Sequence, residues 1–269
     1  MISISSSSRS KTLQSLVPSV TKHAFSSTPT AQAIVELRQY ALHPSSTAHY
    51  TQQTIASSPH RKSLPLKFFG FPETGAIPLN TAVHLYHYKS HADRLQMRAE
   101  LAEKQEWQDY LGNVKECMKE QQSEIFVEAP LIKEFDEVSG LSALQDNSTA
   151  GVGSTKSIIE FRKYQLQLGY ETVPNFLQLY SSALPSKLAT IHPTTQLISL
   201  LVSDITSLNT VYEIWKHGDT MTCGMSAMEE SRVRSRDALE WRRGIGEIAK
   251  LSVRFESSVL RPVVFSPLQ

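Results

Sequence analysis

Two short segments place glutamate, arginine and tyrosine at alternate positions, and these residue types could bind an anion or transfer a proton. The segments are IVELRQY at 34–40 and IIEFRKY at 158–164. In a β-strand, alternate side chains point to the same face of the sheet. An arginine on that face could hold an anionic ligand, and a nearby histidine could move a proton. The alternative is an ion-pair network that fixes how two sheets pack, since an unpaired buried charge is costly. We favour the network, because it occurs in both segments.

Two further blocks recur in the same order along the chain, which indicates a duplicated domain. LNTAVHLYHY at 79–88 returns as LNTVYEIWKH at 208–217, and RAELAEKQEW at 98–107 returns as RVRSRDALEW at 232–241. In the last pair, Arg98 recurs as Arg232 and Trp107 as Trp241. We expect the two tryptophans to anchor the core, because each lies at helical spacing within its block.

The hydrophobic periodicity predicts strand, helix, strand, strand, helix and strand in each copy. In the first copy these elements are expected at 34–42, 46–57, 66–72, 81–88, 93–120 and 124–129. In the second copy, a helix has its apolar face between Val173 and Leu188, and a second helical stretch covers 225–250. This order is the ferredoxin-like βαββαβ plan, a four-stranded antiparallel sheet with both helices on one side.

We therefore predict an α+β protein in which two ferredoxin-like domains pack sheet to sheet and enclose a barrel, with the helices outside. The expected domains are 26–132 and 157–269, and the Gly-, Ser- and Asp-containing segment 133–156 is the expected linker.

The alternation of the strands predicts which residues share a face. We expect Val35, Leu37, Ile159 and Phe161 to pack under the helices. The opposite face would then line the barrel interior and supply the ligand candidates. These are Glu36, Arg38, Tyr40, His84, Tyr86, Tyr88, Glu160, Arg162, Tyr164, Glu213, Trp215 and His217.

The repeated blocks and the terminal FSPL at 265–268 resemble the NIPSNAP family. The resemblance implies the dimeric α+β-barrel superfamily, two domains in tandem and a mitochondrial location. Animal members of the family are linked to vesicle transport and to marking damaged mitochondria for autophagy. The chain departs from the family's HxWxY run, because Tyr86 replaces the tryptophan in the first copy, and Glu213 and His217 replace the histidine and tyrosine in the second. Chemistry that needs these three residues together therefore does not carry over.

Composition excludes several other classes of function. The net charge of +1 gives no electrostatic case for nucleic-acid binding. No apolar run approaches the roughly 20 residues of a transmembrane helix. Cys117 and Cys223 are the only cysteines, so we expect a reducing compartment rather than a disulfide framework. His84 and His87 would point to opposite faces of a strand, and we predict neither a metal site nor a cofactor.

The first 25 residues have the composition of a mitochondrial presequence. They are basic, rich in serine and free of acidic residues, and Leu13, Leu16, Val17 and Val20 form one face of a short helix. The alternative is a disordered tail, because Pro18 would weaken that helix. We predict import to the mitochondrial matrix, with the mature chain starting near Ser26.

Two hypotheses about function follow. The first is a non-catalytic NIPSNAP-type protein that binds a small molecule in the barrel, or protein partners, in mitochondrial quality control or vesicle-linked processes. The second is an enzyme that uses the polar interior for an oxygenase-like or isomerase-like reaction on a small anionic or aromatic substrate. An open pocket of roughly 300 Å³ or more that touches Arg38 or Arg162 would favour the second. Either form could be a homo-oligomer.

Overall fold

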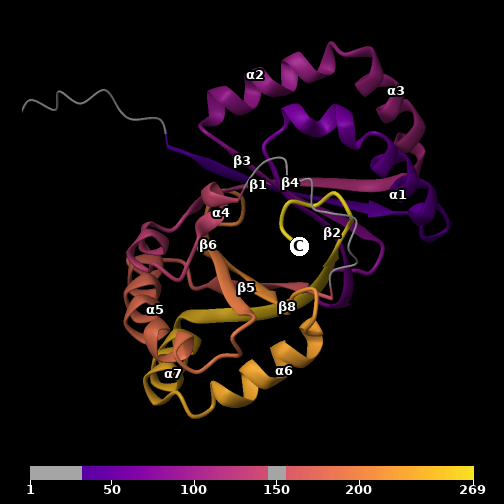
Figure 1. The fold of residues 1–269 in the computed structure, drawn as a ribbon. Helices are drawn as coiled ribbons and strands as arrows, with labels where there is room; N and C mark the ends of the chain where they lie inside the picture. The colour runs from indigo at the N-terminus through magenta and orange to yellow at the C-terminus, as the bar shows by residue number, and fades with distance from the viewer. Residues whose placement is uncertain (1–31, 145–155) are drawn as a thin grey trace, which may run out of the picture. The chain divides into compact units, whose positions relative to one another are not determined.

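The computed structural model describes residues 32–144 and 156–269 (Figure 1). The predicted presequence at 1–25 lies outside the described residues. Each half of the described chain supplies four strands. The strands of the first half are β1 (Ile34–Leu42), β2 (Leu66–Gly75), β3 (Thr81–Tyr88) and β4 (Met118–Glu128). Those of the second half are β5 (Ile158–Leu166), β6 (Thr195–Ile205), β7 (Thr210–His217) and β8 (Ser252–Pro262).

These strands form one closed antiparallel barrel in the order β1-β3-β2-β8-β5-β7-β6-β4. The halves join at two seams, where β2 pairs with β8 and β4 pairs with β6. The prediction of an α+β protein built around a barrel is therefore confirmed.

None of the helices in the described residues combines the length and the apolarity that a membrane span needs.

The helices lie outside the barrel, against the strands of their own half (Figure 1). The first half has α1 (Thr47–Ala56), α2 (His91–Ala102) and α3 (Gln105–Val114). The second half has α5 (Thr172–Leu188), α6 (Gly224–Arg234) and α7 (Leu239–Leu251). Each single long helix expected near the end of a copy is two helices. The chain turns at 103–104 in the first half and at 235–238 in the second.

Part of the segment expected as a linker packs against the fold. It contains the short helix α4 (Gly140–Ala143), and Leu141 is fully buried in an apolar cluster with residues of both halves. Val138 is also buried, in the cluster under α5 and α7. Residues 145–155 of this segment are not described.

The barrel interior is apolar, which corrects the expected orientation of the sheets. Val35, Leu37, Ile159 and Phe161 share one buried cluster drawn from both halves, and none of them lies under the helices. The rings of Phe68 and Phe161 cross the interior with centroids 5.5 Å apart. An eight-stranded barrel is just wide enough for side chains to fill it. The charged face of each sheet therefore meets the helices, which bring their own charged partners.

Candidate ligand-binding pocket

All twelve predicted site residues lie between the sheet and the helices. The six in each half share one face, as the alternation predicted. Glu36 lies opposite Tyr86 in the β1–β3 register, and Glu160 lies opposite Trp215 in the β5–β7 register. Their expected position in a shared barrel interior is wrong, because the two groups lie on the outer faces of their own halves. The structure therefore has two separate polar sites.

In the first half, Glu36 is fully buried and bonded to the helix that covers it. Arg94 and Arg98 of α2 donate to its two carboxylate oxygens at 2.7 and 2.9 Å, and Ser123 donates at 2.6 Å. Arg38 stays 4.0 Å away. Burial alone would raise the pKa of Glu36, but the hydrogen bonds from Arg94 and Ser123 and the charge of Arg98 lower it to about 2.

In the second half, Glu160 repeats this arrangement. Arg232 of α6 donates to it at 2.7 Å and Ser257 at 2.7 Å, while Nε of Arg162 lies 2.9 Å away. Nε2 of His217 lies 3.1 Å from the other oxygen and must carry the proton, since a carboxylate only accepts. Burial opposes ionisation of Glu160, but the His217 hydrogen bond and the charge of Arg162 hold its pKa well below the ordinary value.

His217 itself is held as a neutral ring. Its Nδ1 lies 3.1 Å from Oγ1 of Thr195, which can donate to it. Burial lowers the pKa of His217, and the hydrogen bond to Glu160 offsets only part of that effect. The ring is therefore a hydrogen-bonded spacer between β6 and β5 at neutral pH.

Glu213 is a second buried carboxylate on the same face. It accepts from the hydroxyl of Tyr164 at 2.8 Å and from Nε1 of Trp215 at 2.7 Å. Nη1 of Arg162 lies 3.5 Å from it. Arg162 thus joins Glu160 and Glu213, and it is the central cation of the buried network.

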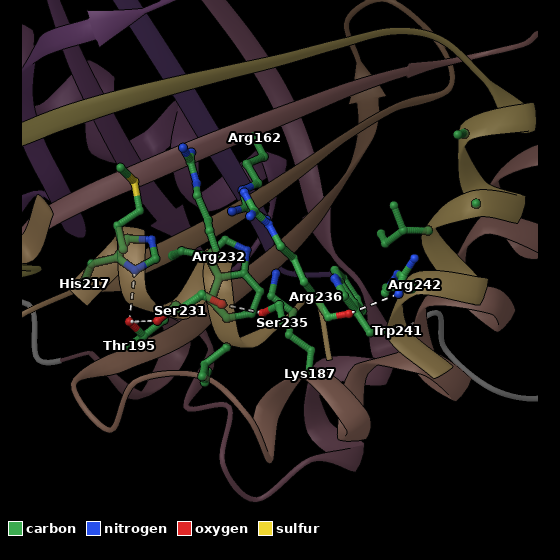
Figure 2. A pocket seen from close by; sticks show the side chains of 16 residues that line it. Arg162, Lys187, Thr195, His217, Ser231, Arg232, Ser235, Arg236, Trp241 and Arg242 are labelled. Atoms are coloured by element: carbon green, nitrogen blue, oxygen red, sulfur yellow. Dashed lines mark hydrogen bonds between the residues drawn. The ribbon is translucent and has the colours of Figure 1, made fainter. Parts of the chain in front are cut away.

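A cavity of about 440 Å³ opens between this network and the helices of the second half (Figure 2). Its cationic side chains are Arg162, Lys187, Arg232, Arg236 and Arg242. Trp215 and Trp241 form its aromatic wall. No aspartate or glutamate lines it in the described part of the chain, because Glu160 and Glu213 are covered by their partners. A pocket of this kind attracts an anion that also carries apolar surface.

Lys187 is the least expected member of this lining. It lies in the last turn of α5 and is only 4% exposed. Its Nζ is 3.8 Å from the ring centroid of Trp215 and 4.2 Å from that of Trp241. It has no hydrogen-bond partner among the described residues. Burial, reinforced by the positive charge of Arg162, lowers its pKa to about 7.

The first half has a smaller cavity at the corresponding place. Its volume is about 310 Å³, and its lining includes Arg38, Arg98 and Lys115. Its wall is richer in aromatic residues, namely Tyr40, Tyr50, Tyr86, Trp107 and Tyr110. The hydroxyl of Tyr50 lies 3.4 Å from Nε2 of His84, which is one of the predicted site residues.

Sequence reasoning missed Lys187, although a signal was present. The position lies seven residues after Tyr180 and three after Leu184, so it falls on the apolar face of the predicted helix. A lysine on such a face indicates either burial or a partner.

Trp241 was expected to anchor the core, and it is buried, packing edge-on against Tyr180. It also forms part of the cavity wall. No group of three or more metal-ligating side chains occurs in the described ranges.

Comparison with known proteins identifies the domain of the first half. The NIPSNAP family model matches residues 35–133. The chain therefore carries a NIPSNAP domain there, and the resemblance seen in the sequence is confirmed for this domain. An uncharacterized NIPSNAP-like domain protein from Burkholderia xenovorans is 29% identical over 37% of this chain and 87% of its own, with a TM-score of 0.34.

Two solved structures match across both halves. One is described as a "putative monooxygenase" from Lactobacillus acidophilus, with a TM-score of 0.54 and 10% identity over 86% of this chain and 94% of its own. The other carries the same description and comes from Fusobacterium nucleatum, with a TM-score of 0.57 and 10% identity over 86% and 93%. At this identity the similarity shows the fold alone. No curated protein matches the chain.

Proposed function

We propose that the protein binds a small anionic molecule with an aromatic or apolar part in the cavity of the second half. The observation that carries this proposal is the cavity lining, where cationic side chains and two tryptophans converge and no carboxylate of the described residues is exposed. Its volume of about 440 Å³ lies within the range of roughly 300–1,000 Å³ found for small-molecule sites. Arg162 lines the cavity, as we expected of a ligand site at this strand. The cavity lies between the sheet and the helices, and not inside the barrel.

The cationic residues divide into two roles. Arg162 and Arg232 are paired with buried carboxylates. Arg236 and Arg242 line the cavity at exposed positions and form no ion pair in the described ranges, and Nη1 of Arg242 lies 3.4 Å from the carbonyl oxygen of Arg236. These two guanidinium groups are the proposed anion contacts, because binding an anion would not break an existing pair.

Titration with 3-phenyllactate, which carries a carboxylate and an aromatic ring, tests this function. Trp215 and Trp241 line the cavity, so binding should change tryptophan fluorescence, and the change should shrink in Trp241→Phe. We expect Arg242→Gln to weaken binding about 10-fold, as expected for a lost charge-assisted contact. Arg243→Gln is the matched control, because Arg243 is exposed on the same helix and pairs with Glu240 outside the cavity. Equal effects of both variants, or no binding, would refute the proposed site.

A second candidate function is catalysis in the same cavity, an oxygenase-like or isomerase-like reaction on a small anionic or aromatic substrate. The observation in its favour is Lys187, a buried amine with a lowered pKa in the same cavity as the proposed anion contacts. Without turnover, the protein would be a non-catalytic binding protein of the NIPSNAP type, acting with protein partners or as a homo-oligomer in mitochondrial quality control or vesicle-linked processes.

We further infer that both halves are ferredoxin-like units from one duplication. The strand order supports this, since β4-β1-β3-β2 in the first half is repeated as β8-β5-β7-β6 in the second. Glu36 with Arg98 and Ser123 corresponds to Glu160 with Arg232 and Ser257. The order within each half is that of a βαββαβ sheet.

We also propose that residues 1–25 direct import into the mitochondrial matrix. The support is the acid-free, basic and serine-rich composition of this stretch. A fluorescent fusion of the full chain should enter mitochondria, and the same fusion without residues 1–25 should stay in the cytosol. Mitochondrial import of the truncated fusion would refute the proposal.

A further inference from the structure

We propose that the amine of Lys187 forms a reversible imine with the carbonyl carbon of a small keto acid held in the cavity of the second half. This inference rests on the proposed function, because the acid group of the ligand is held by the anion contacts described above. It adds the chemical class of the ligand, an acid that also carries a ketone or aldehyde, and a covalent step.

The position of Lys187 fits an amine that must react. The side chain extends from α5 towards the guanidinium groups of the cavity (Figure 2). Its Nζ lies against the faces of Trp215 and Trp241 and has no hydrogen-bond partner within the described residues. By contrast, Lys67 is equally buried, but its Nζ donates to the carbonyl oxygen of Leu144 at 2.5 Å. A structural lysine is satisfied in this way, whereas Nζ of Lys187 lies buried against two indole faces and makes no hydrogen bond within the described residues.

Burial and the positive charge of Arg162 favour the neutral amine of Lys187, which is the nucleophilic form, whereas the faces of Trp215 and Trp241 favour the ammonium. Its pKa of about 7 follows first from burial and then from the nearby positive charge of Arg162, against which Glu213 and Glu160 act more weakly. The titratable and charged groups around it come from every neighbouring element. They are Glu160, Arg162 and Tyr164 on β5, Glu213 and His217 on β7, Tyr180 on α5, Arg232 on α6, and Arg236 and Arg242 around the start of α7.

The step balances without any further reactant. The lone pair of Nζ attacks the carbonyl carbon, and the electron pair of the C=O bond moves to oxygen. The two protons of the amine pass to that oxygen, the C–O bond breaks, and water leaves. The product is a C=N bond between ligand and lysine, and hydrolysis reverses the reaction. Neither carbon nor nitrogen changes its oxidation state overall, so no oxidant or reductant is needed.

The anion contacts would place the carbonyl near the amine. In an α-keto acid the carboxylate and the ketone are adjacent, so a carboxylate bound by the cavity arginines brings the ketone carbon within the same cavity as Nζ. The aromatic wall suits a ligand with a ring. Among the described residues that line the first-half cavity, the one lysine is Lys115, and it is exposed.

Phenylpyruvate and 3-phenyllactate form a matched pair of probes, since they share the carboxylate and the ring but only phenylpyruvate has a ketone. The full chain is incubated with phenylpyruvate and reduced with borohydride, which turns an imine into a stable secondary amine. Mass spectrometry of peptides should then find one probe molecule, less one oxygen atom, on Lys187. Lys67 is the internal control for a buried lysine and should remain unlabelled.

The pH dependence of labelling provides a second readout that does not rely on a variant. Labelling of Lys187 should rise with pH around a midpoint near 7, whereas an exposed lysine reacts with a midpoint near its ordinary pKa of about 10.4. Lys187→Gln should reduce the labelling by at least 10-fold.

The outcomes separate the two proposals. If phenyllactate binds but phenylpyruvate leaves Lys187 unlabelled, the imine is refuted and the anion site stands. Labelling confined to exposed lysines also refutes the imine. If neither probe binds, the proposed function fails and takes the imine with it.

Discussion

The two halves of the barrel build the same charged scaffold but use it differently. In each half a buried glutamate on the first strand is bonded to an arginine of the covering helices and to a serine of the last strand. In the first half this glutamate takes two arginines from α2, and Arg38 stays at 4.0 Å. In the second half Arg162 moves into contact and connects Glu160 to Glu213.

The comparison distinguishes the residues that stabilise the fold from those proposed to bind a ligand. Features present in both halves, such as the glutamate with its arginine and serine, fix helices to sheet. Features present in one half only are Glu213 in place of His84, the buried Lys187, and the cations Arg236 and Arg242. The second-half cavity is also the larger, at about 440 Å³ against about 310 Å³. The second half therefore combines the shared network with a larger cavity that carries more cationic side chains.

The largest expected difference between the halves concerns the arginine of the repeated strand. Arg162→Ala leaves Glu213 buried without its cation, and we expect a loss of about 3–5 kcal/mol in the free energy of unfolding. Arg38→Ala should cost about 1 kcal/mol or less, because Glu36 keeps Arg94 and Arg98. Urea denaturation measures both. Adding Glu213→Gln to Arg162→Ala should recover part of the loss, which shows coupling between the two groups. Equal costs for the two arginines would refute the difference between the networks.

A smaller difference concerns the pH dependence of stability. The pKa of Lys187 is lowered to about 7 in the folded state, so above that pH the unfolded chain binds a proton that the folded chain lacks. The free energy of unfolding should therefore gain up to about 1.4 kcal/mol per pH unit from this residue between pH 7 and pH 9. Lys187→Met should remove this rise.

Lys115→Met is the control for this prediction, because Lys115 lines the first-half cavity but is exposed. Its denaturation profile should follow that of the unsubstituted chain from pH 7 to pH 9. If the profile of Lys187→Met also follows that of the unsubstituted chain, Lys187 is charged in the folded state.

A further contrast between the halves concerns two helical glycines. Gly244 of α7 faces α5 so closely that an added Cβ would lie 2.5 Å from Cβ of Ala183. Gly244→Ala should therefore destabilise the protein by about 1–3 kcal/mol through overpacking. Gly112 in α3 has open space around it, and Gly112→Ala should stabilise by about 0.5–1 kcal/mol through helix propensity. Thermal denaturation of both variants measures the contrast, and stabilisation by Gly244→Ala would show that α5 and α7 pack less tightly.

The sequence predicted the strands and the residues that share a face, because a period of two is a direct consequence of strand geometry. It did not predict which face meets the helices. Both faces carry side chains large enough to fill a core, namely Val35 and Leu37 on one face and Tyr40 and Tyr86 on the other. The repeated pair Arg98 and Arg232 held the missing information, since helical arginines that recur together with strand glutamates indicate that the charged face lies under the helices.

The cavity was harder to predict than the fold. Its lining comes from β5, α5, β6, β7, α6 and α7, and no short motif spans these elements. Arg236 and Arg242 look like ordinary surface cations in the sequence, and only the turn at 235–238 between α6 and α7 brings them to the cavity. The depressed pKa of Lys187 depends on burial against two tryptophans from different elements, which no local pattern encodes.

A crystal structure of the full chain soaked with 3-phenyllactate tests the central claim most directly. We expect density for one ligand in the cavity of the second half, with its carboxylate at Arg236 or Arg242 and its ring against Trp215 or Trp241. Density in the first-half cavity or in the barrel interior instead, or an empty second-half cavity at a saturating concentration of the ligand, would contradict it.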